Sequence, residues 1–152
     1  MYITVMNRNE AIQYCHQSHD EKSVIISIST PCEEYHDEPF MSTIIGNGVY
    51  EICRVEFFDI DGNYPISSGR MTIDDAEIIA DVIERNQDKH IIVHCDAGQS
   101  RSAGVAAALA KYYNNNDEEY FNNTRMVPNM WCYRLMLVAL YGENYPERNV
   151  EK

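Results

Sequence analysis

Long apolar runs and basic residues are both scarce in this chain of 152 residues. No stretch approaches the length of about 18 apolar residues that a membrane-spanning helix needs, and no basic region followed by an apolar one opens the chain. We therefore expect no membrane span, no export signal and a cytoplasmic protein. Lys and Arg total 12 against 24 Asp and Glu, a net charge of −12. This charge opposes binding to nucleic acid or anionic lipid, so an anionic substrate needs a local binding site.

Closely spaced cysteine pairs are also lacking, so the cysteine pattern does not indicate a disulfide framework. The five cysteines are Cys15, Cys32, Cys53, Cys95 and Cys132. Their number is odd, none belongs to a Cys-x-x-Cys pair, and no zinc-like cluster surrounds them. We expect reduced thiols, and we interpret all of them except Cys95 as small buried apolar residues.

Length and composition predict one globular domain over residues 1–152, with 45% hydrophobic and 24% charged residues. Apolar runs and capping signals alternate along the chain. The predicted strands are residues 2–5, 24–29, 51–59 and 90–94, and the predicted helices are residues 7–17, 72–86, 102–113 and 130–141. This order favours an α/β fold, a mostly parallel central sheet flanked by helices. Residues 31–47, with two prolines and several charges, are predicted to form an exposed excursion.

The strongest functional signal lies between the strand at 90–94 and the helix at 102–113. It reads His94-Cys95-Asp96-Ala97-Gly98-Gln99-Ser100-Arg101-Ser102. The residues between Cys95 and Arg101 can curl so that backbone N–H groups converge in front of a helix N-terminus, which suits a phosphate. Arg101 can add a planar, bidentate contact to two phosphate oxygens. The same positive field favours the thiolate form of Cys95, which is the form that a nucleophile needs.

This motif resembles the signature of the cysteine-dependent protein tyrosine phosphatase superfamily: His-Cys, five residues, then Arg followed by Ser or Thr. The dual-specificity branch, with its small bacterial and phage-like members, is the most similar. Its loop has the same pattern of Gly98, Ser100 and Ser102 before an Ala-rich helix, and its compact phosphatase domain has a similar length. Val127-Pro128-Asn129 before the last helix strengthens the match. The resemblance covers most of residues 24–141, whereas residues 1–23 and 31–50 carry no motif that aligns.

The resemblance implies a two-step hydrolysis of a phosphomonoester that needs no metal or other cofactor. Cys95 attacks phosphorus and forms a phosphocysteine while an aspartic acid protonates the leaving oxygen, and the aspartate then activates water for the second step. Arg101 and the loop N–H groups stabilise the transition state, Ser102 helps the thiolate to leave, and His94 orients the loop. The implied phosphate-binding residues are Asp96, Ala97, Gly98, Gln99, Ser100 and Arg101.

Two aspartates are candidates for the general acid. In this family the acid lies upstream of the cysteine, on a loop just after a strand and two residues beyond the last inward apolar residue. If Val55 and Phe57 form the inward face, the acid is Asp59. Asp61, nearer the turn at Gly62, is the second candidate.

The substrate that we expect is a phosphorylated protein or a small phosphomonoester. A chain this short lacks the loops that deepen the pocket of the larger tyrosine-specific enzymes, so phosphoserine and phosphothreonine are plausible beside phosphotyrosine. Asp96 and Gln99 stand where lipid phosphatases of the superfamily often carry lysine, which disfavours inositol phosphates, and the net charge disfavours RNA. The alternative is a phosphate- or phosphoprotein-binding module without turnover, which is expected to have lost the cysteine, the arginine or the acid.

Overall fold

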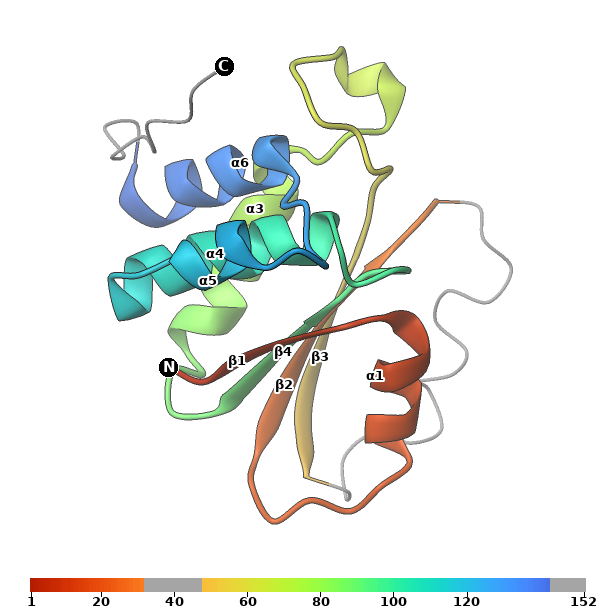
Figure 1. Ribbon diagram of the computed structural model, residues 1–152, viewed down its shortest axis with the longest axis vertical. Helices are drawn as coiled ribbons and strands as arrows, with labels where there is room; N and C mark the ends of the chain where they lie inside the picture. Colours follow the sequence, from red (N-terminus) through yellow and green to blue (C-terminus); the bar gives the residue numbers. More distant parts are fainter. Residues whose placement is uncertain (32–47, 143–152) are drawn as a thin grey trace.

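The computed structural model describes residues 1–31 and 48–142, which form one sheet with helices on both faces (Figure 1). The strands are β1 (Ile3–Met6), β2 (Ser23–Ser29), β3 (Val49–Glu56) and β4 (His90–His94). Their order is β1-β4-β2-β3, and each neighbouring pair is parallel. The predicted α/β fold with a parallel central sheet is therefore confirmed. Apart from Pro31, the predicted excursion at 31–47 lies outside the described residues, as does Cys32.

The two faces of the sheet carry different helices. Helix α1 (Arg8–Cys15) packs on one face, with Ala11 and Cys15 against Ile25 and Ile92. The other face is covered by α3 (Ile73–Glu84), α4 (Arg101–Asn114), α5 (Glu118–Asn122) and α6 (Met130–Tyr141), which are grouped together in Figure 1. Every residue of the central strands β2 and β4 is buried, as expected for parallel strands covered on both sides. Cys15, Cys53 and Cys132 are buried, as interpreted from the sequence.

Local signals set most of the element boundaries. Asn7 and Thr72 both form complete capping boxes, so α1 and α3 begin where the sequence predicts. The strand expected at 51–59 ends earlier, at Glu56. The short helix α5 and the 3₁₀ turn η1 (Ile66–Ser68) were not anticipated. None of the helices in the described parts of the chain is long and apolar enough to cross a membrane.

The loop that carries the Cys95–Arg101 motif lies at the edge of the sheet where the parallel strands end. The carboxyl ends of β2, β3 and β4 lie side by side and lead into Thr30, the segment containing Asp59, and the loop containing Cys95 respectively. Parallel α/β sheets place their binding sites at this edge, because successive strands deliver their following loops to one side. Helix α4 begins at this edge, after the loop that follows β4, and residues 101–110 of the helix are all buried.

Candidate active site

Residues 95–100 form an irregular loop between β4 and α4, and this loop packs on the N-terminal part of the chain. Gly98 has a φ of +68°, and a Cβ there would lie 2.8 Å from the backbone N of Asn7. The Arg8 N–H also donates to the carbonyl oxygen of Asp96 at 3.2 Å. Only glycine fits this close approach in the left-handed conformation. The turn between β1 and α1, which the family resemblance did not cover, is thus the support on which the loop rests.

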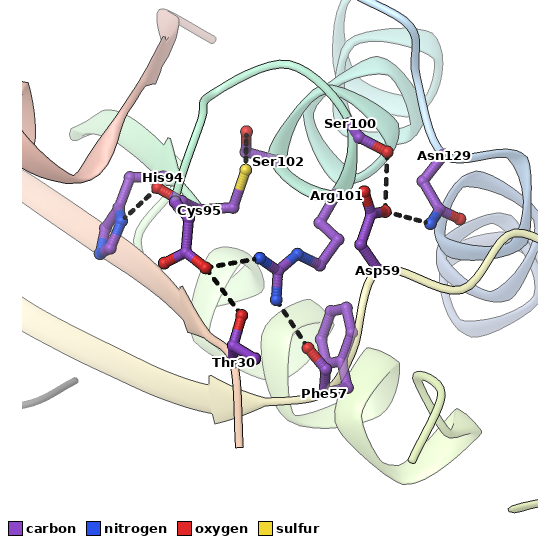
Figure 2. Close-up of polar contacts among 10 residues, drawn as sticks. Thr30, Phe57, Asp59, His94, Cys95, Ser100, Arg101, Ser102 and Asn129 are labelled. Atoms are coloured by element: carbon purple, nitrogen blue, oxygen red, sulfur yellow. Dashed lines mark hydrogen bonds and ion pairs between the residues drawn. The ribbon is translucent and has the colours of Figure 1, made fainter. Parts of the chain in front are cut away.

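The nucleophile candidate lies at the bottom of this loop. Cys95 is 2% exposed, and its Sγ lies 3.0 Å from the Oγ of Ser102 in the first turn of α4 (Figure 2). In the described part of the chain, the backbone N–H groups of residues 97–100 donate to no protein acceptor. Free N–H groups next to a helix N-terminus provide the donors and the positive partial charge that an anion requires.

Arg101 is buried, and two acceptors hold its guanidinium. Its Nη1 donates to the carbonyl oxygen of Phe57 at 2.7 Å (Figure 2). Its Nη2 donates to Oδ2 of Asp96 at 3.0 Å. The same Asp96 oxygen accepts a hydrogen bond from Thr30 Oγ1 at 2.7 Å. Partial burial acts to raise the pKa of Asp96, but the hydrogen bond from Thr30 and the charge of Arg101 outweigh it, and the pKa lies below its usual value. Asp96 is therefore a carboxylate at neutral pH.

His94 lies beneath the loop as a neutral side chain. Its Nε2 is 2.6 Å from Ser27 Oγ, and its Nδ1 is 3.2 Å from the carbonyl oxygen of Cys95. Burial lowers the pKa of His94 to about 4. A carbonyl oxygen can only accept, so in the neutral ring Nδ1 carries the proton and Nε2 accepts from Ser27. The ring thus joins β2 to the backbone at Cys95, where the loop begins.

The two candidate acids lie in different surroundings. Oδ1 of Asp59 accepts hydrogen bonds from Ser100 Oγ at 2.7 Å and from Asn129 Nδ2 at 2.8 Å, so this carboxylate lies against the loop (Figure 2). Oδ1 of Asp61 instead accepts from the backbone N–H of Trp131 at 3.1 Å, in the first turn of α6. Asp59 is thus the aspartate that the fold brings to the loop.

Asn129 contacts both the loop of residues 95–100 and the segment that contains Asp59, and the sequence did not reveal these contacts. It is 1% exposed, its Nδ2 contacts Asp59 and the carbonyl oxygen of Ile60, and its Oδ1 caps α6 by accepting from the Cys132 N–H. Its backbone N–H donates to the carbonyl oxygen of Ser100 at 2.9 Å. The Val127-Pro128-Asn129 motif had marked this segment, but its contacts to the other two loops needed the tertiary structure.

The described residues contain no group of three or more His, Cys, Asp or Glu side chains placed to hold a metal ion. Around Cys95 lie instead the backbone N–H groups of residues 97–100, the Arg101 guanidinium, and the side chains of Asp96 and Asp59. Backbone N–H groups and a guanidinium are the donors that suit a tetrahedral oxyanion, and a thiol lies at the bottom of the same loop.

Comparison with known proteins gives a fold but no close relative. No protein-family model and no curated protein matches the sequence. Among solved structures, Tk-PTP in its active form is 15% identical with a TM-score of 0.52, covering 91% of this chain and 90% of its own. PTPMT1 in complex with PI(5)P is 18% identical with a TM-score of 0.53, covering 89% and 87%. The human tyrosine phosphatase-like serine/threonine/tyrosine-interacting protein is 16% identical with a TM-score of 0.54, covering 76% and 74%. The chain therefore has the fold of these tyrosine phosphatase and tyrosine phosphatase-like structures.

Proposed function

We propose that this protein is a cysteine-dependent phosphatase that hydrolyses phosphotyrosine, and also phosphoserine or phosphothreonine, in proteins. One observation carries the proposal: Cys95, the free N–H groups of residues 97–100 and the buried Arg101 belong to a single loop at the N-terminus of α4. Each component has a separate use in phosphoryl transfer, and the shared fold of the tyrosine phosphatase-like structures supports their combination.

In the first step, Sγ of Cys95 attacks phosphorus and the bond to the ester oxygen breaks. The leaving oxygen takes a proton from Asp59, which lies against the loop through Ser100. Arg101 and the N–H groups of residues 97–100 stabilise the negative charge on the equatorial oxygens.

In the second step, water attacks phosphorus and the phosphorus–sulfur bond breaks. Asp59 now accepts the proton of that water, and phosphate leaves. The Ser102 hydroxyl, 3.0 Å from Sγ, stabilises the departing thiolate. A cytoplasmic setting, in which thiols stay reduced, fits this chemistry.

A phosphoprotein is a better match than a highly charged inositol phosphate. The net charge of −12 and the ionised Asp96 inside the loop both repel a polyanion. One structural neighbour was solved with PI(5)P, so a phosphoinositide belongs in the substrate panel.

The alternative is a phosphoprotein-binding module without turnover. It is kept because one neighbour is described as a tyrosine phosphatase-like interacting protein. The presence of Cys95, Arg101 and Asp59 at one edge of the sheet favours the enzyme.

Hydrolysis of p-nitrophenyl phosphate in the presence of a chelator tests the proposal. We expect activity in the wild type, none in Cys95→Ser, and retained activity in Cys53→Ser, a matched change on β3 away from the loop. With phenyl phosphate, whose leaving group needs protonation, Asp59→Asn should lower kcat by about 10²-fold or more, the usual contribution of a general acid, and Asp61→Asn should lower it much less. Absence of turnover in a folded wild type that still binds phosphate would assign the chain to the binding modules.

A further inference from the structure

Asp96 stands inside the phosphate-binding loop, where a negative charge opposes an anionic ligand. Its carboxylate is ionised, and its side chain is 37% exposed. A site that only had to attract phosphate would gain nothing from this residue. Its contacts show what the carboxylate does instead, because a single oxygen, Oδ2, accepts from both Arg101 Nη2 and Thr30 Oγ1.

The contacts of Arg101 determine the orientation of its guanidinium plane. The group is planar and has five N–H donors in a fixed arrangement. One donor of Nη1 is used by the Phe57 carbonyl and one donor of Nη2 by Asp96, so two contacts at separate nitrogens fix the plane. Three donors remain for a ligand, including the one on Nε. A bidentate contact to phosphate oxygens depends on that orientation, because both N–H groups must meet their acceptors together.

We propose that Asp96 is a positioning residue that, itself held by Thr30, fixes the guanidinium of Arg101 before the substrate binds. The inference rests on the proposed phosphatase function and deepens it. Thr30 directly follows β2 and Phe57 directly follows β3, so the ends of two strands orient the arginine that α4 contributes. Arg101 is buried and held in one orientation in the free protein, so its side chain loses little conformational entropy when the substrate binds. The site is preorganised in this sense.

This role predicts an unequal effect on binding and on catalysis. Removing the carboxylate frees the guanidinium to rotate, which weakens contacts that matter most in the transition state. It also removes a charge that repels the dianionic substrate, which strengthens ground-state binding. Looser contacts of Arg101 raise KM, whereas loss of the repelling charge lowers it, so KM changes little. Both consequences lower kcat, because the transition state is bound less well and the ground state better.

The test compares Asp96→Ala, Asp96→Asn, Thr30→Val and the double variant Asp96→Ala/Thr30→Val with p-nitrophenyl phosphate. Loss of one charge-assisted hydrogen bond predicts that kcat falls about 10- to 100-fold in Asp96→Ala, with KM changed by less than about 3-fold. Asp96→Asn keeps an acceptor oxygen and should recover part of kcat. Thr30→Val should give a smaller loss that disappears in the Asp96→Ala background, because Thr30 acts through Asp96. Asp81→Asn, the same charge change on the exposed surface of α3, should leave both constants unchanged.

Oxyanion binding separates this inference from the function on which it rests. Vanadate adopts the five-coordinate geometry of the transition state, whereas phosphate resembles the ground state. Asp96→Ala should weaken vanadate binding, measured by calorimetry, by the same 10- to 100-fold factor, with phosphate binding changed by less than about 3-fold. Equal loss of both oxyanions, an unchanged kcat, or additive effects of Thr30 and Asp96 would overturn the positioning role. If the wild type shows no turnover, the phosphatase function fails, and the ratio of vanadate to phosphate affinity still decides the role of Asp96.

Discussion

Replacement of Asn129 separates the stability of α6 from the placement of the proposed acid. The Asn129 side chain caps α6 through Oδ1 and donates through Nδ2 to Asp59 and to the carbonyl oxygen of Ile60. An N-cap contributes about 1 kcal/mol, and a buried hydrogen bond contributes about the same. Asn129→Ala should therefore lower the free energy of unfolding by about 2–4 kcal/mol. Asn129→Ser supplies a new capping oxygen and should recover about 1 kcal/mol of this loss.

The effect on catalysis should differ from the effect on stability. Both variants remove the amide donor to Asp59 and leave only Ser100 to hold it. We expect kcat for phenyl phosphate, whose leaving group needs the acid, to fall about 10-fold in both, which corresponds to one hydrogen bond of about 1.4 kcal/mol. p-Nitrophenyl phosphate, with its better leaving group, should be less affected.

Urea unfolding and initial rates at one temperature provide the two readouts. Our reasoning requires two variants with different stabilities and the same loss of activity. If Asn129→Ser recovered activity in proportion to stability, Asn129 would act through the start of α6, and its contact with Asp59 would have no separate role.

Three further predictions concern the packing and protonation of the loop. Gly98→Ala combines a left-handed backbone with a Cβ 2.8 Å from backbone atoms, and should cost about 2–4 kcal/mol in urea unfolding. Gly104→Ala places a Cβ in overlap with the backbone carbonyl oxygen of Asn129 and should cost about 2–3 kcal/mol. Gly62→Ala, whose Cβ meets only a side chain, should cost less than about 1 kcal/mol. Similar losses of stability at the three positions would refute this view of the packing. The pKa of His94 is about 4 in the folded protein and near the ordinary histidine value of 6.5 in the unfolded chain. The unfolded state therefore binds more protons between these pH values, and the stability falls as the pH falls through them. The wild type should lose about 2 kcal/mol more than His94→Gln between pH 7 and pH 5, and an equal loss would show that His94 is not buried in its neutral form.

Elements with local signals could be predicted closely from the sequence. The capping boxes at Asn7 and Thr72 involve residues three positions apart, and both are present in the structure. The apolar strand at 90–94 and the helix at 130–141 also have the predicted bounds. Helix α5 was missed because it follows a polar run and buries a single residue, Tyr120, which gives no helical periodicity.

The surroundings of the loop could not be predicted, because they come from distant parts of the chain. Ser27 and Thr30 reach the loop only after β2 pairs with β4. The support of Gly98 by the turn after β1 likewise depends on the parallel pairing of β1 with β4. No single-sequence pattern encodes such contacts, since each joins residues that are far apart in the chain and lack a shared motif.

The early end of β3 explains why the choice between Asp59 and Asp61 needed the tertiary structure. Alternation along a strand sends residues to opposite faces, and that rule holds only while the chain stays in the sheet. The chain leaves the sheet after Glu56, where Phe57 is still buried and its carbonyl oxygen already accepts from Arg101. From there, side-chain direction depends on the partners that each residue meets. Asp59 meets Ser100 of the loop and Asp61 meets the N-terminus of α6, so contacts between loops, and not strand periodicity, distinguish the two carboxylates.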